Sequence, residues 1–335
     1  MPRVTIQVLA DRLGVSTASV SYALNGQSGV SEATRKRVLE LAEELGWRPS
    51  SSARALSRSR TDVIGLVVTK NPQLFGTEPY LMRLIEGIED VLTRAKKSLL
   101  LRMVGTEPGL EIEVYRQWSA EQRVDGVFVI DLRVGDPRPL LLHELGLPFT
   151  IPGTHSGALT SEDNATDALT IMSHLADLGH HEIFQLLGPL YLDHEMQRQA
   201  AVTRHATQMN MRVFFTEGDY TLDVAEHTVE EVFRHDASMS AIITSNDVMA
   251  VGAVKALRTL GRRDIGVISW DDSILCSVTT PSISALSRHP EEEGRRAARI
   301  LLDLIEGKHS SLVAPPESQL IQRETSVPAP VRQPK

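Results

Sequence analysis

The sequence has a single cysteine and no long apolar run, and each of these features excludes some classes of protein. Cys276 has no second cysteine with which to form a disulfide, and a cysteine metal cluster is excluded for the same reason. No apolar stretch approaches the roughly 20 residues that a membrane helix needs, so we predict no membrane partner. No apolar signal-peptide core follows Met1, and we expect the chain to stay in the cytoplasm.

The motifs of common enzymes are also missing. The sequence has no GxxxxGK[ST] phosphate loop, no GxSxG nucleophile turn and no HExxH metal motif. Asp271 and Asp272 are adjacent, but neighbouring loop carboxylates usually point apart. His180 and His181 follow Gly179, where histidines often only cap the carbonyls of a helix end. We therefore predict no catalytic residue, no cofactor and no metal site.

Charge is unevenly distributed along the chain. The net charge is −8, yet residues 1–60 contain nine Arg and Lys against five Asp and Glu, which leaves +4 there and −12 in the remainder. A small basic head on an acidic body is expected where only the head meets phosphate groups. The length of 335 residues suits such a head joined to a larger, two-lobed body.

Three short helices are predicted in the first fifty residues. Thr5 can cap a helix whose apolar residues recur at i, i+3, i+4 and i+7, and Gly14 can end it. Ser16 can cap a second helix after a tight turn, and Ser31 a third. The pattern fits a helix-turn-helix over residues 1–49, although a three-helix bundle without a role in DNA binding would show the same periodicity.

In a helix-turn-helix, the N-terminal residues of the second helix enter the major groove of DNA. Thr17 and Tyr22 can exchange hydrogen bonds with base edges, and the Ala18 methyl group can contact a thymine methyl. The predicted DNA-binding residues of the head are Thr5, Ser16, Thr17, Ala18, Ser19, Tyr22, Asn25 and Ser31.

From residue 63 onward, short apolar runs such as VIGLVVT, EIFQLLG and IGVISW alternate with amphipathic segments. This alternation predicts parallel α/β sheets, and a Pro- and Gly-containing stretch at 148–157 divides the runs into two doubly wound lobes. The predicted divisions are a linker at 50–60, a first lobe at 61–157 and 287–318, a second lobe at 158–286 and 319–328, and a flexible tail at 329–335.

Ligands of open parallel sheets bind beyond the carboxyl ends of the strands, so residues that follow the apolar runs are candidate contacts. They are Asp131, Tyr220, Asn246, Trp270 and Asp271. Carboxylate and amide groups bind pairs of sugar hydroxyls, and an aromatic face covers the apolar side of a sugar ring. The set favours a mono- or oligosaccharide effector, although Tyr220 and Trp270 could instead be core residues.

The chain resembles the LacI/GalR family of bacterial repressors. The runs VTIQVLA, GVSTASVS, ALNG, VSEATRKRVL, LGWRP and SARAL carry the resemblance, which continues more sparsely to near residue 326 through TSNDVMAVGAVKAL and SWDDSILCSVTTPSISAL. It implies a periplasmic-binding-protein-like body and a homodimer that binds a near-palindromic operator in double-stranded DNA. It further implies an allosteric repressor switched by a small molecule, here expected to control carbohydrate utilisation.

The resemblance also implies roles for a hinge at residues 50–57. This segment would fold in the minor groove, where Leu56 wedges between base pairs and Arg54 adds a DNA contact. Tyr22 departs from the family pattern, since many members carry a guanine-reading arginine at its position.

In the body, the resemblance adds Arg198 and Tyr80 to the effector-binding residues, whereas Asp131 lies one residue out of register with the family's usual polar position. The tail has no leucine heptads, so a dimer is expected rather than a tetramer. Three alternatives stay open: a solute-binding protein for uptake, a cytosolic sugar-binding or sugar- or nucleotide-processing protein without operator binding, and a regulator that senses a purine.

Overall fold

The structure is a computed structural model. It describes residues 5–47, 60–69, 78–107, 109–153, 161–236, 238–308 and 317–330. The chain divides into two compact units, Met1–Thr61 and Asp62–Lys335, and each is described by itself. The predicted hinge at 50–57, with Arg54 and Leu56, lies outside the described residues.

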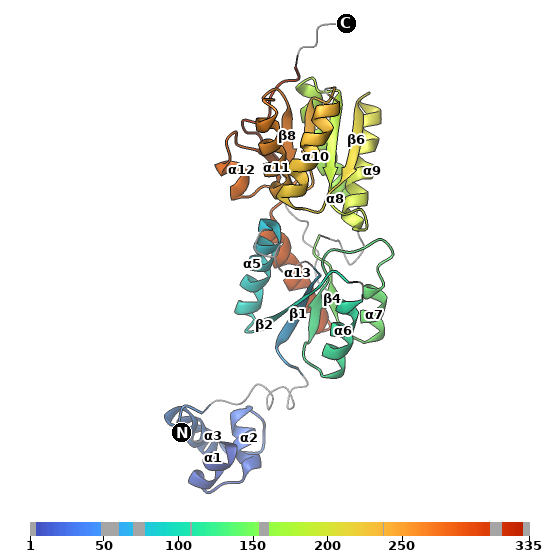
Figure 1. Ribbon diagram of the computed structural model, residues 1–335. Helices are drawn as coiled ribbons and strands as arrows, with labels where there is room; N and C mark the ends of the chain where they lie inside the picture. Colours follow the sequence, from blue (N-terminus) through green and yellow to red (C-terminus); the bar gives the residue numbers. More distant parts are fainter. Residues whose placement is uncertain are drawn as a thin grey trace. The chain divides into compact units, whose positions relative to one another are not determined.

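The first unit contains the three expected helices around one small core. They are α1 (Ile6–Leu13), α2 (Thr17–Leu24) and α3 (Glu32–Glu44) (Figure 1). The core residues come from the apolar stripes of all three helices and are Leu9, Ala10, Val20, Ala23, Val38 and Ala42.

The predicted helix ends are only partly as the sequence indicated. Gly14 ends α1 in the left-handed conformation at φ 65°, which favours glycine. The Ser16 hydroxyl accepts a hydrogen bond from the Ser19 amide at 3.1 Å, and Ser31 caps α3 in the same way. Thr5 occupies the cap position of α1, but its side chain makes no capping hydrogen bond, so the prediction that it caps the helix was wrong.

The second unit begins with a four-stranded parallel sheet. Its strands are β1 (Val63–Thr69), β2 (Ser98–Val104), β3 (Gly126–Phe128) and β4 (Phe149–Thr150), in the order β2-β1-β3-β4. Helices α5 (Pro79–Arg94) and α13 (Pro290–Ile305) cover one face through Leu84, Ile88 and Leu301. Helices α6 (Leu110–Ala120) and α7 (Arg138–Glu144) cover the other through Trp118 and Leu142.

A second sheet of six strands follows. Its strands are β5 (Glu182–Leu187), β6 (Arg212–Glu217), β7 (Ala241–Thr244), β8 (Gly266–Ser269), β9 (Ser284–Ser287) and β10 (Gln319–Ile321), in the order β10-β9-β8-β7-β5-β6. All neighbours are parallel except β10 and β9. Its helices are α8 (Ser161–Asp177), α9 (Asp193–Gln208), α10 (Leu222–His235), α11 (Asp247–Thr259) and α12 (Ile274–Val278).

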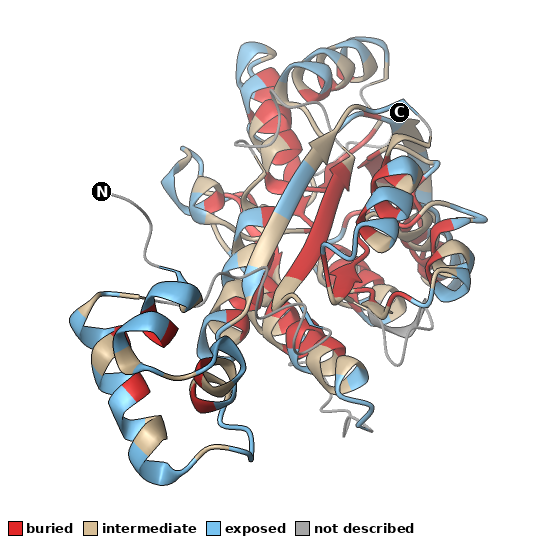
Figure 2. Cartoon of the chain, turned by 90° about the horizontal axis from the view of Figure 1, so that it is seen from below, coloured by how far each residue is buried: buried red, intermediate tan, exposed pale blue. Residues whose placement is uncertain are grey.

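Helices α8 and α9 pack on one face of this sheet and α10 and α11 on the other, so each sheet is a separate doubly wound lobe. In Figure 2 the buried residues gather on the strands and on the helix faces turned toward them. The chain returns to the first lobe through α13, which packs on α5, and to the second through β10. The predicted fold class is therefore confirmed. No described helix is both long and apolar enough to cross a membrane.

Candidate functional site

The exposed face of α2 carries the side chains predicted to contact DNA. Thr17 and Ala18 are exposed, and Tyr22 is 42% exposed, while Val20 and Ala23 on the opposite face are buried. The Tyr22 ring lies beside Gly29, where an added Cβ would come within 3.2 Å of it. The segment after α2 therefore lies against one edge of the ring, while much of the residue stays exposed.

The other predicted head residues make hydrogen bonds within the head. Ser16 and Ser31 cap α2 and α3, and Asn25 donates from Nδ2 to the Ser21 hydroxyl at 3.3 Å. Ser19 is half-buried, and its hydroxyl lies 2.9 Å from that of Ser16. Since helix N-termini favour nearby anions, the two capped ends suit DNA phosphates.

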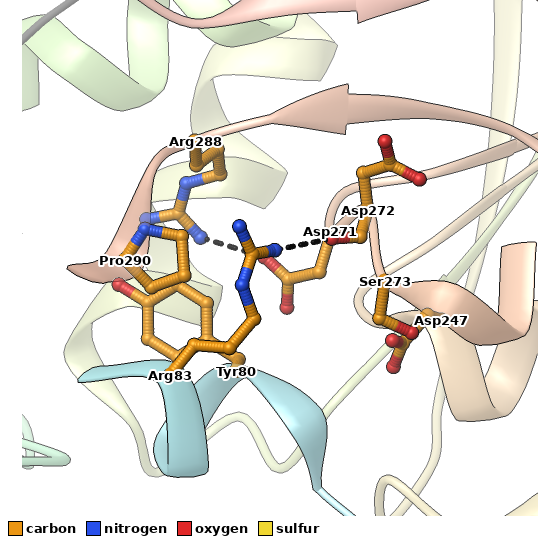
Figure 3. Close-up of a pocket in the computed structure, with 8 residues that line it drawn as sticks. All are labelled: Tyr80, Arg83, Asp247, Asp271, Asp272, Ser273, Arg288 and Pro290. Atoms are coloured by element: carbon orange, nitrogen blue, oxygen red, sulfur yellow. Dashed lines mark hydrogen bonds and ion pairs between the residues drawn. The ribbon is translucent and has the colours of Figure 1, made fainter. Parts of the chain in front are cut away.

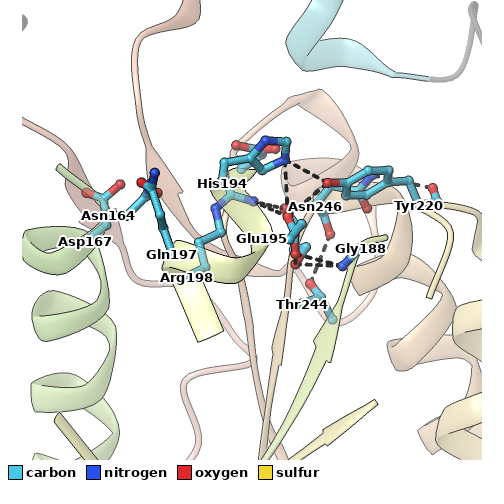
Figure 4. Close-up of polar contacts among 12 residues, drawn as sticks. Asn164, Asp167, Gly188, His194, Glu195, Gln197, Arg198, Tyr220, Thr244 and Asn246 are labelled. Atoms are coloured by element: carbon cyan, nitrogen blue, oxygen red, sulfur yellow. Dashed lines mark hydrogen bonds and ion pairs between the residues drawn. The ribbon is translucent and has the colours of Figure 1, made fainter. Parts of the chain in front are cut away.

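In the second lobe, a buried carboxylate organises the predicted effector residues (Figure 4). Glu195 is fully buried and accepts hydrogen bonds from the Gly188 amide at 2.8 Å and the Tyr220 hydroxyl at 2.9 Å. Arg198 donates from Nη1 to Glu195 Oε1 at 2.9 Å and to the Ser245 carbonyl at 3.1 Å. His194 Nε2 lies 2.8 Å from the Tyr220 hydroxyl.

Burial shifts the titration of this cluster. It raises the pKa of Tyr220 well above its usual value, and the charge of Glu195 raises it further. Burial also lowers the pKa of His194, so the imidazole is neutral near pH 7. For Glu195, burial opposes ionisation, but Arg198 and the surrounding hydrogen bonds outweigh it and lower the pKa. The cluster therefore contains a carboxylate, a guanidinium and two neutral rings.

Two predicted residues serve the interior of the lobe. Trp270 is fully buried in the core beneath Arg198, whose guanidinium carbon lies 4.9 Å from the ring centroid. The structure thus gives Trp270 the core position that was its alternative, because neither ring face is exposed. Asn246 is 4% exposed, and its side chain accepts from the Met249 amide at 2.8 Å, which caps α11.

A second polar cluster lies where the two lobes meet (Figure 3). A small pocket is lined by Tyr80, Arg83, Asp247, Asp271, Asp272, Ser273, Arg288 and Pro290. Arg288 Nη1 donates to Asp271 at 3.1 Å, and the guanidinium lies 5.2 Å from the Tyr80 ring centroid. Arg288 therefore brings together two predicted residues, Tyr80 from the first lobe and Asp271 from the second.

The same region contains direct contacts between the lobes. Arg83 of α5 pairs with Glu291 of its own lobe and donates from Nη1 to the Asp272 carbonyl at 2.8 Å. The amide of Asp193, the first residue of α9, donates to the carbonyl of Leu132 on the loop after β3 at 2.9 Å. The polar loops at the strand ends therefore join the two lobes.

Neighbouring Asp271 and Asp272 point to different partners, as expected for adjacent loop carboxylates. Asp271 pairs with Arg288, whereas Asp272 accepts from Arg323 Nη2 at 2.9 Å. Asp131 has a positive φ of 51°, and its carbonyl accepts from Arg138 at 2.8 Å. Within the described ranges, no group of three or more His, Cys, Asp or Glu side chains could hold a metal ion.

Sequence reasoning missed Arg288, His194 and Glu195. Arg288 directly follows β9. The expectation that ligand contacts follow the strands would have identified Arg288 if the short run SALS had been recognised as a strand. His194 and Glu195 lie in the first turn of α9, and no spacing in the sequence marks that turn as buried.

Known proteins resemble both units. The family described as "Bacterial regulatory proteins, lacI family" matches residues 5–50, and the "Periplasmic binding protein-like domain" matches residues 172–326. A solved LacI family transcriptional regulator from Bifidobacterium animalis subsp. lactis is 31% identical with a TM-score of 0.70, and the match covers 81% of this chain and 100% of that one.

Two further relatives differ in the ligand class that their names indicate. The solved transcriptional regulator CelR-cellobiose complex is 27% identical with a TM-score of 0.71, and the match covers 96% of this chain and 100% of that one. The HTH-type transcriptional repressor PurR of Aliivibrio salmonicida is 29% identical over 320 residues, covering 91% of this chain and 93% of its own.

Proposed function

The chain belongs to the lacI family of bacterial regulatory proteins, and we propose that this ligand-responsive repressor is switched by a sugar that binds between its two lobes. The proposal includes control of carbohydrate-utilisation genes, action in the cytoplasm and no catalytic step in the cleft. It also retains the predicted effector residues that face the cleft, with Arg288 and His194 added to them.

The observation that carries the sugar proposal is the acceptor capacity of the Asp271 carboxylate in the pocket between the lobes. Asp271 is paired there with a single arginine nitrogen, so its oxygens can accept further hydrogen bonds. A ligand rich in hydroxyl donors suits such a site. The similarity to CelR, solved with cellobiose, supports the same class.

A purine is the second ligand class to test, because PurR is as similar in sequence as the sugar-binding relative. A planar base gains most from an open aromatic face. Arg288 lies over the Tyr80 ring and Arg198 over the Trp270 ring, so cations already occupy these faces. The structure therefore offers no open aromatic face at Tyr80 or Trp270 on which a base could stack.

On the DNA side, we propose that a homodimer sets two copies of α2 in successive major grooves of a near-palindromic operator, about one helical turn apart. Thr17, Ala18 and Tyr22 would contact base edges, since they form the exposed face of α2. The hinge contacts proposed for Arg54 and Leu56 rest on the family resemblance alone.

The proposed switch is a change in the angle between the lobes that is transmitted to residues 50–57. Allosteric coupling of a few kcal/mol is enough to form or melt a short hinge helix. Because such coupling is reciprocal, a sugar that weakens operator binding must itself bind less tightly to the operator complex.

The test uses the full-length protein and a DNA duplex enriched from a random palindromic pool. Fluorescence anisotropy would compare this duplex with a scrambled one over a range of salt concentrations and then with added cellobiose, glucose or hypoxanthine. We expect salt-sensitive preference for the enriched duplex and a change in affinity with a sugar. A response to hypoxanthine alone would reassign the ligand class, and the absence of duplex preference would refute the operator proposal.

A further inference from the structure

Glu195 is the most heavily hydrogen-bonded acidic side chain in the effector cluster. One oxygen accepts from Arg198 Nη1 and the Tyr220 hydroxyl, and the other from the Gly188 amide and the Ser245 hydroxyl. The residue is fully buried, so solvent does not screen its charge. Its negative charge therefore acts in full on the arginine one helical turn away.

The pairing uses only part of Arg198. Its Nη1 is occupied by Glu195 and the Ser245 carbonyl, whereas its Nε is buried and has no hydrogen-bond partner among the described residues. Arg198 therefore has a buried nitrogen that Glu195 does not use, while Glu195 offsets its positive charge.

The other guanidiniums at the cleft are also paired with carboxylates. Arg288 donates to Asp271 and lies 3.6 Å from Asp167. Arg83, which lines the same pocket, pairs with Glu291, and His194 is neutral. A ligand phosphate or carboxylate would thus meet no arginine whose charge lacks a carboxylate partner.

We infer that Glu195 determines the charge selectivity of the effector site: by neutralising Arg198 it makes the cleft select uncharged ligands and reject anions such as phosphorylated sugars. This inference rests on the proposed ligand site, but not on which sugar binds there. Glu195 acts through Arg198 and Tyr220 and is a positioning residue.

Glu195→Gln is the decisive variant, because glutamine has nearly the same shape and can still accept from Arg198 while the negative charge is lost. Glu226→Gln is the matched control, since Glu226 pairs with Lys255 at the surface between α10 and α11, away from the cleft. Calorimetric titrations of the full-length proteins at constant ionic strength would use glucose, cellobiose, glucose 6-phosphate and inorganic phosphate.

We expect no measurable binding of glucose 6-phosphate or phosphate to the wild-type protein or to Glu226→Gln. Glu195→Gln should gain at least about tenfold in affinity for these anions, which is about 1.4 kcal/mol. A purely structural role for Glu195 would weaken all ligands and create no anion binding. Circular dichroism would verify that each variant is folded.

The outcomes separate this inference from the proposed function. Sugar binding by the wild type without any anion gain in folded Glu195→Gln would overturn the inference and leave the sugar proposal intact. An anion gain without sugar binding by the wild type would support the inference and refute the sugar proposal. If Glu195→Gln does not fold, the affinity of the wild-type protein for glucose 6-phosphate tests the inference. Binding of glucose 6-phosphate as tight as that of glucose overturns the inference, and the absence of glucose 6-phosphate binding supports it.

Discussion

Asp247 is a buried acid whose ionisation should oppose folding at neutral pH. It is the first residue of α11, is 2% exposed and accepts a hydrogen bond from the Val248 amide at 2.8 Å. Burial raises its pKa to about 7, and the nearby charge of Asp271 contributes to the increase. The native protein therefore holds a proton on Asp247 that the unfolded chain releases at lower pH.

The sign and size of the effect follow from this difference. An unfolded aspartate titrates near pH 3.9, about three units below the native value, and each unit corresponds to about 1.4 kcal/mol. The stabilisation is fully present below about pH 4 and is lost as the pH rises to about 7. Asp247→Asn removes the titration, so the variant should gain up to about 4 kcal/mol over the wild type between pH 4 and pH 8.

Urea unfolding followed by circular dichroism at pH 5, 6, 7 and 8 would measure this gain. Asp264→Asn is the control, because Asp264 pairs with Arg262 at 2.8 Å and this hydrogen bond lowers its pKa. A half-exposed ion pair of this kind stabilises the folded state by about 0–1 kcal/mol. Asp264→Asn should therefore lower the unfolding free energy by no more than this amount, at the higher pH values. If Asp247→Asn changes the unfolding free energy equally at pH 5 and pH 8, the buried-charge reasoning is refuted.

Two other predictions concern helix packing and DNA recognition. Gly294→Ala should destabilise the protein by about 1–3 kcal/mol, because a Cβ at this position of α13 would overlap the Leu84 carbonyl oxygen of α5. An unchanged thermal melting temperature would contradict this prediction. Tyr22→Phe keeps the ring beside Gly29 but removes the hydroxyl, so it should reduce the preference for operator over scrambled duplex by about 1–3 kcal/mol without altering the salt dependence. Anisotropy competition would measure that preference, and equal discrimination by both proteins would exclude the Tyr22 hydroxyl as a base contact.

Hydrophobic periodicity predicted the elements that have strong apolar faces. The runs at β1, β5 and β8 are buried along most of their length, and their sequences are mainly apolar. Strand β9 was not predicted because SALS is short and half polar, although the fold buries three of its four residues between β8 and β10. Tertiary pairing, rather than local composition, makes that segment a strand.

The expectation that ligand contacts follow the strands selected residues near the cleft but could not give the direction of each side chain. Asp271 and Trp270 are consecutive, yet one pairs with Arg288 in the cleft and the other turns into the core. The Asn246 side chain caps the N-terminus of α11. A polar residue between a strand and a helix is as typical of a helix cap as of a ligand contact. The role of Glu195 was not predicted, because the burial of a charged residue in the first turn of a helix requires hydrogen-bond partners such as Tyr220, which is 25 residues away in the sequence.

The polar character of the interlobe contacts suits the proposed switch. Two hydrogen bonds join the lobes, from Arg83 to the Asp272 carbonyl and from the Asp193 amide to the Leu132 carbonyl. Exchanging such a hydrogen bond for one to water costs about 0.5–1.5 kcal/mol, and somewhat more for the charged arginine. A ligand shifts an equilibrium only by its difference in affinity between two states. Because Arg288 contacts both Tyr80 and Asp271, a ligand that changes the partners of Arg288 would change contacts on both lobes at once, which is the difference between two states that the proposed switch requires.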